Sequence, residues 1–444
     1  MTNPVEPKKK RLIVIANLIH ASPRMPGLLA PLARKGWDIT IITPPLPENS
    51  PDILGFPEDF AEECQIIETS PYVDVYEPIR SVMRALSLVK KDAEDGYTAA
   101  LKSDAPANGL KSKFINWMLS SYQSVFAYPD TEKGWIKDAT IVAQNTLTKN
   151  PGALLLSTSP YPSSHIVANK IACAHQIIWV ADYRDPWSQN HNYQMAWWRK
   201  LVDRWAEKRV MRPASRIISA SEGFSKKLQA LHKRPVATIR NGFHPSTQIA
   251  YERSNVDKVC IRYTGRVYPK FQSVAPILDA LQKIRDEHLG DITKFEIEFF
   301  GPYSSEVESA VADRKLQNIV FQRGSVSRSV IRELQQKADI LLLLQWENQK
   351  ETGIFPLKFL EYLDAGRPIL ATGNSLAGEI SDILRETGAG TPFNRVEDIA
   401  SYLLAAYDEI ASKGRLGYQG VDEKIALFSY ENSAIELEEL LSEL

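Results

Sequence analysis

The chain has 444 residues, enough for two or three domains, and its 44% hydrophobic and 24% charged residues are ordinary for a globular protein. Its 53 basic and 54 acidic residues leave a net charge of −1, which gives no electrostatic case for a nucleic-acid partner. Three widely spaced cysteines argue against a disulfide framework and a zinc site and indicate a reducing, cytoplasmic location.

Residues 11–42 predict a βαβ unit. An apolar run at 11–16 predicts a buried parallel strand, 27–35 a helix, and 37–42 a second strand. The short run at 11–16 is not the long apolar core of a signal peptide, and nowhere do 18 consecutive apolar residues predict a transmembrane segment. The intervening loop lacks GxGxxG, so no dinucleotide fingerprint is present. His20 and Arg24 lie on this loop; we interpret His20 as a solvated loop residue and Arg24 as a candidate ligand for an anionic group.

The segment from 44 to 135 has a different character. Five prolines between 44 and 57 interrupt regular structure, and 79–91 predicts a helix. Residues 114–128 predict an aromatic helix preceded by Lys111 and Lys113, a pattern that suits a membrane surface. We favour a helix that packs on its own domain, and the segment could also form a lid or an acceptor surface.

Two loops at the ends of predicted strands carry polar side chains. The helix 134–149 and the strand 152–157 lead to the segment STSPYPSSH, in which His165 opens the next helix. The strand 177–181 leads to DYRDPW, which holds Asp182, Arg184 and Asp185. In doubly wound sheets such loops face the ligand, so His165 and Asp182 are candidates for a catalytic site. The alternatives are a capped histidine at a helix start and structural pairing of Arg184 with Asp182 or Asp185.

The remaining elements predict a second α/β domain. An amphipathic helix at 197–211, a strand, a helix at 222–231 and a strand precede a polar boundary region near 245–257. The strand 259–264 then leads to Gly265, Arg266 and Lys270, where glycine permits close backbone approach and two cations suit a diphosphate. Further strands at 295–300, 319–322 and 338–344 continue the alternation, and 429–444 predicts a terminal amphipathic helix.

The stretch 352–371, TGIFPLKFLEYLDAGRPILA, predicts a loop, a helix at 357–365 that Gly366 ends, and a buried strand. The amides at the start of this helix form an anion site. Lys358 could join a phosphate there, and Glu361, on the same face, could accept from ribose hydroxyls. The alternative is a packed helix with a surface Lys–Glu pair. The loop and the helix start predicted to hold this ligand comprise Gly353, Ile354, Phe355, Pro356 and Leu357.

These motifs resemble glycosyltransferase family 4 and its relatives, retaining enzymes of the two-domain GT-B fold. The resemblance rests on GxxPxKxxEYLxxGxPIL from Gly353, on DxRDxW from Asp182, on the Gly265–Arg266 pair and on the Asn241–Gly242 segment. It covers nearly the whole chain outside about 50–130. Two glutamates eight positions apart are typical of the family; Glu361 matches the second, whereas Gly353 occupies the position of the first.

The resemblance implies an α/β protein of two doubly wound Rossmann-like domains that face each other across a cleft. The first would span 1–247 with an insert at about 50–130, the second 248–425, and 426–444 would form a helix that packs back toward the first. Arg266 and Lys270 would grip the donor diphosphate, Glu361 would hold the ribose, and His20, Arg24, Arg184 and Asp185 would lie on the acceptor side.

The implied activity is that of a hexosyltransferase-like glycosyltransferase of polysaccharide biosynthesis. It would move a sugar from a nucleotide-diphosphate sugar to a hydroxyl of a glycan, a lipid-linked saccharide or a small molecule, with retention and without a metal or cofactor. It would act in the cytoplasm or at the inner face of the membrane, with peripheral membrane contact. A sugar-nucleotide epimerase or hydrolase of the same fold and a non-catalytic nucleotide-sugar binder are the alternatives.

Overall fold

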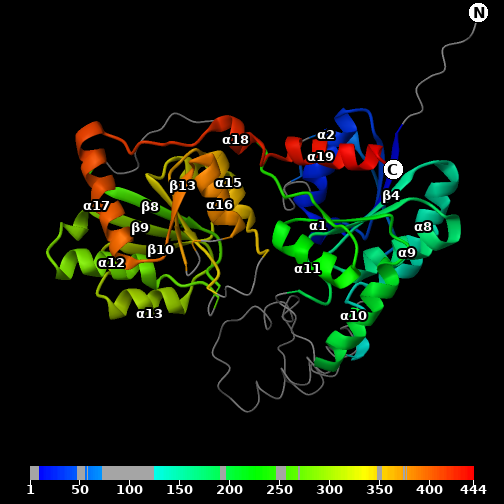
Figure 1. Ribbon diagram of the computed structural model, residues 1–444, viewed down its shortest axis with the longest axis horizontal. Helices are drawn as coiled ribbons and strands as arrows, with labels where there is room; N and C mark the ends of the chain where they lie inside the picture. The colour runs from blue at the N-terminus through cyan, green and yellow to red at the C-terminus, as the bar shows by residue number, and fades with distance from the viewer. Residues whose placement is uncertain are drawn as a thin grey trace, which may run out of the picture. The chain divides into compact units, whose positions relative to one another are not determined.

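The computed structural model describes residues 10–47, 56–57, 59–72, 125–190, 197–246, 257–268, 271–347, 353–373, 376 and 378–444. The chain divides into two compact units (Figure 1). The first comprises 1–220, 224–239 and 434–444, and the second comprises 221–223 and 240–433. The sequence places the domain boundaries at 247 and 425, whereas the contacts of the chain place them at 239 and 433.

The first unit is built on a seven-stranded parallel sheet. Its strands, in spatial order, are β3 (Gln65–Glu68), β2 (Asp38–Thr43), β1 (Arg11–Ile15), β4 (Leu154–Thr158), β5 (Trp179–Tyr183), β6 (Arg216–Ser219) and β7 (Ala237–Thr238). β1, β4 and β5 are almost entirely buried, because helices cover both faces of a parallel sheet. The order reverses between β1 and β4, which makes the carboxyl ends of these strands the place where a ligand is expected.

Helices connect these strands. They are α1 (Leu18–Ala21), α2 (Arg24–Arg34), α4 (Phe60–Glu63), α8 (Ile136–Lys149) after the 3-10 turn η1 (Lys133–Trp135), α9 (Pro162–His175), α10 (Trp197–Met211), α11 (Glu222–His232) and the end of α19 (Tyr430–Ser442). Two predictions here were wrong in detail. The helix expected at 27–35 begins at Arg24, and α1 lies within the expected loop. The strand expected at 177–181 begins at Trp179 and contains Asp182 and Tyr183.

The second unit is built on a six-stranded parallel sheet. Its strands, in spatial order, are β10 (Val320–Gly324), β9 (Phe295–Phe300), β8 (Val259–Thr264), β11 (Ile340–Leu344), β12 (Ile369–Thr372) and β13 (Gly390–Phe393). The helices are α12 (Ala275–Asp286), η2 (Ile292–Lys294), α13 (Ser305–Asp313), α14 (Arg328–Gln336), α15 (Leu357–Ala365), α16 (Glu379–Thr387), α17 (Val396–Lys413) and α18 (Asp422–Ala426). The sequence did not predict α13, α16, α18 or β13.

Strand β11 shows how this sheet holds two cores. Ile340, Leu342 and Leu344 pack in a core that α12 and α17 help to form. Leu341 and Leu343 point to the opposite face, into a core completed by α15 and α16. Because side chains alternate along a strand, a continuous apolar run is what a sheet covered on both faces requires. Figure 1 shows the same arrangement, with α12, α13 and α17 on one side of the strands and α15 and α16 on the other.

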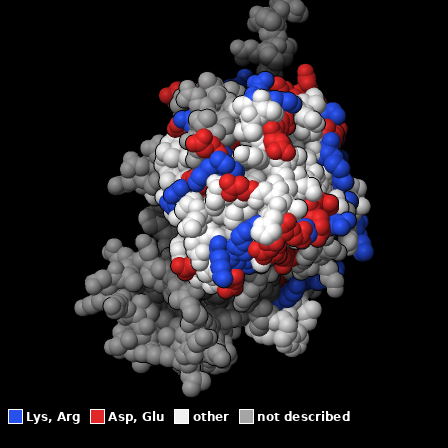
Figure 2. All heavy atoms as spheres, turned by 90° about the vertical axis from the view of Figure 1, so that its left-hand side faces the viewer, with Lys and Arg blue, Asp and Glu red and all other residues white. Residues whose placement is uncertain are grey.

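The two units therefore have the doubly wound α/β architecture that the sequence predicts. On the face of the second unit shown in Figure 2, basic and acidic side chains are interspersed, as the net charge of −1 suggests. None of the described helices is long and apolar enough to cross a membrane. The helix expected at 79–91 and most of the helix expected at 114–128 lie outside the described residues.

Candidate functional site

Helix α15 forms one wall of the candidate site, and its ends follow from its sequence. The helix spans Leu357–Ala365, as predicted, and ends at Gly366, which takes the left-handed conformation with φ 64°. Pro356 is the N-cap, with an extended ψ of 136°, rather than the first helical residue. The strand after Pro368 is β12, so the order of loop, helix and buried strand is confirmed.

Three glycines lie where adjacent strands end. Gly265 follows β8, Gly301 follows β9, and Gly324 is the last residue of β10. The amide of Gly265 donates to the carbonyl of Phe300 at 2.7 Å, and that of Gly301 donates to the carbonyl of Gly324 at 2.9 Å. A Cβ at Gly301 would lie 2.3 Å from the Gly265 carbonyl oxygen. The strand ends can approach one another only because Gly301 has no side chain.

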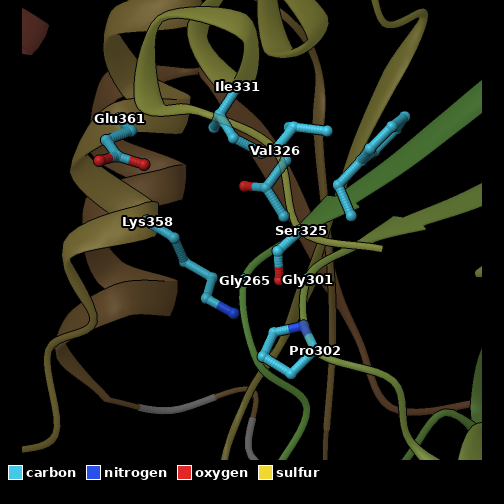
Figure 3. Close-up of a pocket in the computed structure, with 10 residues that line it drawn as sticks. Gly265, Gly301, Pro302, Ser325, Val326, Ile331, Lys358 and Glu361 are labelled. Carbon is cyan, nitrogen blue, oxygen red and sulfur yellow. The ribbon is translucent and has the colours of Figure 1, made fainter. Parts of the chain in front are cut away.

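These strand ends and α15 enclose a pocket of about 240 Å³ (Figure 3). Apolar side chains and the side chains of Lys358 and Glu361 line it, so the pocket has both an apolar and a polar surface. Its lining comprises Thr264, Gly265, Phe300, Gly301, Pro302, Ser325, Val326, Ile331, Lys358 and Glu361. The volume lies just below the range of about 300–1,000 Å³ that is typical of small-molecule sites, so the pocket suits only part of a larger ligand.

The amine of Lys358 reaches from α15 into this pocket (Figure 3). It donates to the Tyr263 hydroxyl and, at 3.4 Å, to the carbonyl of Arg266, and it lies 3.9 Å from the centre of the Tyr263 ring. Burial lowers the pKa of Lys358 from 10.5 to about 7, and nearby Glu361 opposes part of that change. A buried cation this poorly compensated is ready to bind an anion.

Glu361 lies one turn further along α15, and its position is held by neighbours. Its carboxylate accepts from the Gln335 amide at 3.3 Å, and an Arg328 nitrogen lies 3.8 Å away. The same Gln335 amide donates to the Thr264 hydroxyl at 2.9 Å. Glu361 is therefore oriented at the pocket and retains capacity to accept further hydrogen bonds.

The structure brings only some of the predicted donor residues together. Gly265, Lys358 and Glu361 line the pocket. Arg266 follows Gly265 directly, and its carbonyl oxygen accepts from Tyr263 and Lys358. Lys270 lies outside the described residues.

The loop before α15 contributes differently. The carbonyl of Gly353 accepts from the Ser221 hydroxyl at 2.7 Å, and Phe355 packs edge-on against Phe359 at 5.5 Å. The loop residues Gly353, Ile354, Phe355 and Pro356 lead into the helix, which begins at Leu357. None of these five residues lines the pocket. Their roles in donor binding stay predictions.

Sequence reasoning missed the opposite wall of the pocket, formed by Gly301, Pro302, Ser325, Val326 and Ile331. In the sequence, Gly301–Pro302 directly follows the predicted strand 295–300, and Ser325–Val326 lies shortly after the predicted strand 319–322. The rule that ligands bind at the carboxyl ends of parallel strands could have found them, because both segments follow directly on strands.

In the first unit, Asp182 and Arg24 form a fully buried pair. Their side chains are 0% and 1% exposed, and Arg24 Nη2 lies 2.6 Å from Asp182 Oδ1. Arg24 also donates to the Ile239 carbonyl at 2.8 Å, and the Thr158 hydroxyl donates to Asp182 at 2.7 Å. The anionic group that Arg24 binds here is thus the carboxylate of Asp182, whose structural partner is Arg24 rather than Arg184. A catalytic role for Asp182 stays a prediction.

His165 is also fully buried, at the fourth position of α9. Its Nδ1 lies 2.7 Å from the Ser157 hydroxyl, and its ring lies 4.9 Å from that of Tyr183. Burial lowers the pKa of His165 to about 4, so the ring is neutral near pH 7. The N-terminus of α9 is occupied by Asp130, which accepts from the Ser163 amide at 2.6 Å.

The remaining acceptor-side residues gather around the loop after β1. Arg184 donates to the carbonyls of His20 and Ser22, and thereby holds that loop. The His20 ring packs edge-on against Tyr161 at 4.8 Å, and burial together with Arg184 lowers its pKa to about 4. His20 is therefore not the solvated residue that we expected. The backbone of Asp185 is held by the Ser159 hydroxyl at 3.1 Å.

Among the described residues, no group of three or more His, Cys, Asp or Glu side chains could hold a metal ion. All three cysteines are free thiols.

Comparison with known proteins identifies the second unit. Residues 258–409 match the family described as glycosyl transferases group 1. Among curated proteins, none matches this sequence.

Solved structures share the fold over nearly the whole chain. HepE (Alr3699) of Anabaena, in complex with UDP, has a TM-score of 0.61 and 12% identity, covering 98% of this chain and 100% of that chain. A glycosyltransferase of Rickettsia africae has a TM-score of 0.58 and 12% identity, covering 98% of each chain. Sucrose-phosphate synthase of Thermosynechococcus elongatus has a TM-score of 0.55 and 15% identity, also covering 98% of each. Residues 258–409 therefore match the group 1 glycosyl transferases, and the chain as a whole shares the two-domain GT-B fold of these structures.

Proposed function

We propose that the protein transfers a sugar from a nucleotide-diphosphate sugar to a hydroxyl group of a glycan or lipid-linked saccharide. The reaction breaks the bond between the anomeric carbon and the diphosphate, forms a bond to the acceptor oxygen, and releases the acceptor proton. We further propose that configuration at the anomeric carbon is retained, as the resemblance to glycosyltransferase family 4 implies. The proposed location is the cytoplasm or the inner face of the membrane.

One observation carries this proposal: the pocket places the buried amine of Lys358 beside strand ends that are formed by glycines. Lys358 can neutralise a phosphate, and the backbone at Gly265 and Gly301 lets that phosphate approach closely. Pro302, Val326 and Ile331 offer apolar surface for a base, and Glu361 offers a carboxylate for ribose hydroxyls. Charge on the departing diphosphate grows during transfer, and preformed cations that stabilise it are a large part of catalysis.

The proposal involves no metal or cofactor. Lys358, Arg266 and Lys270 would supply the positive charge that a divalent cation supplies elsewhere. In the first unit we assign the acceptor side to the segments that follow β1 and β5, which include His20, Arg24, Arg184 and Asp185. We keep His165 and Asp182 as candidates for a role in transfer. Arg184 supports this assignment because it ties the loop after β1 to the strand end at β5.

A thermal-shift screen of the protein with UDP, GDP, ADP, dTDP, CMP and their common sugar conjugates tests the donor site. A ligand that binds only the folded state raises the melting temperature by mass action. HepE was solved with UDP, so uridine nucleotides are the first candidates. We expect one nucleotide to stabilise the protein and Lys358→Met to reduce that response. Lys413→Met is the matched control, because Lys413 is an exposed lysine at the end of α17 in the same unit.

Product analysis then separates the activities. A transferase consumes the selected sugar nucleotide only when an acceptor hydroxyl is present, and NMR of the product reports the anomeric configuration. Epimerisation or hydrolysis without acceptor would assign the site to the epimerase or hydrolase alternative. Binding without any turnover across an acceptor panel would favour a non-catalytic nucleotide-sugar binder. No response to any nucleotide would refute the donor site.

A further inference from the structure

Helix α10 carries large apolar side chains on its outer face. Trp197, Leu201 and Trp205 are 78%, 61% and 63% exposed, and their spacing of four residues puts them in one row. Trp198 and Val202 widen this row on the same helix. A contiguous exposed apolar patch of this kind usually marks a binding surface.

The inner face of α10 is anchored to the first unit, beside α9 (Figure 1). Arg199 and Asp203 pair at 3.1 Å with side chains that are both about 2% exposed. Glu207 is fully buried and accepts from the Ser188 amide at 3.0 Å. The exposed tryptophans therefore belong to a helix that already has its packing partners on the other side.

The charged residues of α10 also differ between its inner and outer faces. Both of its acidic residues, Asp203 and Glu207, are buried and engaged inside the unit. All of its exposed charged residues are basic, namely Lys200, Arg204, Lys208 and Arg209. The outward surface of this helix is thus both apolar and positive, in a chain whose net charge is −1.

A neighbouring segment also carries exposed apolar side chains. Arg199 donates to the Pro129 carbonyl at 2.7 Å, and its guanidinium lies 4.5 Å from the centre of the Tyr128 ring. These contacts hold the segment ending at Tyr128 against the start of α10. Val125 and Phe126 on that segment are more than half exposed.

We propose that the outer face of α10 docks on an anionic lipid bilayer. Tryptophan is favoured at the boundary between headgroups and acyl chains, where an amphipathic helix lies with its apolar side inward. Lys and Arg flanking that apolar side interact with anionic headgroups. A second copy of the chain is a poorer occupant, because a symmetric contact would place the basic residues of this face against those of the other copy. The proposal goes beyond the donor site and does not depend on which nucleotide or acceptor is used.

Vesicle co-sedimentation of the full chain tests this proposal. We would compare vesicles of phosphatidylcholine alone with vesicles containing 30% phosphatidylglycerol, each at low and high salt. We expect binding to the anionic vesicles that high salt weakens. The triple variant Trp197→Ser, Leu201→Ser, Trp205→Ser should lose binding at least tenfold, and Arg204→Gln with Lys208→Gln should lose about fivefold per charge.

Two controls make the outcomes decisive. Leu289→Ser removes an exposed apolar side chain from the second unit and should leave binding unchanged. The melting temperature of the triple variant should match that of the natural protein, because its three side chains are exposed. Failure of the natural protein to bind anionic vesicles overturns the proposal. A marked fall in the melting temperature of the triple variant, or the loss of a self-associated form, also overturns it, since the face would then be occupied by protein.

Discussion

Replacing Lys358 by methionine is the most informative perturbation of the candidate site. Methionine keeps a long unbranched side chain but removes the charge that burial opposes. Burial lowers the pKa of Lys358 from its ordinary 10.5 to about 7. At about 1.4 kcal/mol for each pH unit, that difference corresponds to about 5 kcal/mol against the charged folded state. The contact with the Tyr263 ring is lost in the variant and offsets roughly 1–2 kcal/mol. We therefore expect Lys358→Met to raise the free energy of unfolding of the second unit near pH 7.

The pH dependence of this gain provides the sharper test. The folded-state pKa lies below the unfolded one, so the cost of Lys358 is fully present below pH 7 and disappears as pH rises toward 10.5. Between pH 7 and pH 9 the stability advantage of Lys358→Met should shrink by about 2–3 kcal/mol. Other titrations cancel in the difference between the two proteins. Hydrogen exchange of the buried amides in β8 and β11 measures the opening free energy of this unit.

The affinity for a nucleotide should also depend on pH, and Lys358→Met should lower it rather than raise it. A bound diphosphate favours the protonated amine, so the affinity of the natural protein should fall by up to tenfold per pH unit above pH 7. Lys358→Met should bind at least tenfold more weakly at pH 7 and lack this pH dependence, as isothermal titration calorimetry can measure. A stability advantage that does not change between pH 7 and pH 9 would refute the reasoning about the buried amine. Unaltered nucleotide affinity would refute its role in the donor site.

Glu361→Ala should weaken binding of the nucleotide about tenfold or more and leave binding of pyrophosphate unchanged in calorimetry; equal losses would contradict the ribose role. Gly301→Ala should cost roughly 1–3 kcal/mol in chemical denaturation, because its Cβ would meet a carbonyl oxygen. Gly324→Ala is its control: a Cβ there meets open space, and we expect only the strain of φ +80°, about 1 kcal/mol. Asp182→Asn should leave a buried arginine without its counter-charge and lower the melting temperature by roughly 10 °C; lost activity with an unchanged melting temperature would point instead to catalysis. His165→Gln should reduce the loss of stability in acid by up to about 3 kcal/mol between pH 6.5 and pH 4. Burial lowers the pKa of His165 to about 4, so only the unfolded state gains a proton in that range. Urea titrations at pH 7 and pH 4.5 measure the free energy of unfolding, and an equal decrease for the variant and the natural protein would exclude this role of His165.

Much of the fold follows from short-range patterns in the sequence. Largely apolar runs such as 259–264 and 340–344 are strands because a parallel sheet buries both faces of each strand. The helix Leu357–Ala365 and its end at Gly366 follow from apolar spacing and from the left-handed conformation that glycine adopts easily. The α10 helix was delimited correctly at both ends by the same reasoning. Elements with short or mixed patterns, such as α16 and β13, could not be recognised in this way.

The sequence also determined that Gly265 follows a strand and that Lys358 and Glu361, three residues apart, share one face of a helix. Only the tertiary structure decided what these side chains meet, because pairing depends on strand order and on burial, which local patterns do not encode. Strand order brings Gly301, Pro302 and Val326 to the same pocket as Gly265, although 36 or more positions separate each of them from Gly265 in the chain. In the folded protein, Arg24 and Asp182 form a buried ion pair, and His165 is buried as well. The acidic residues of α10 face inward, and its tryptophans are therefore exposed on the outer face.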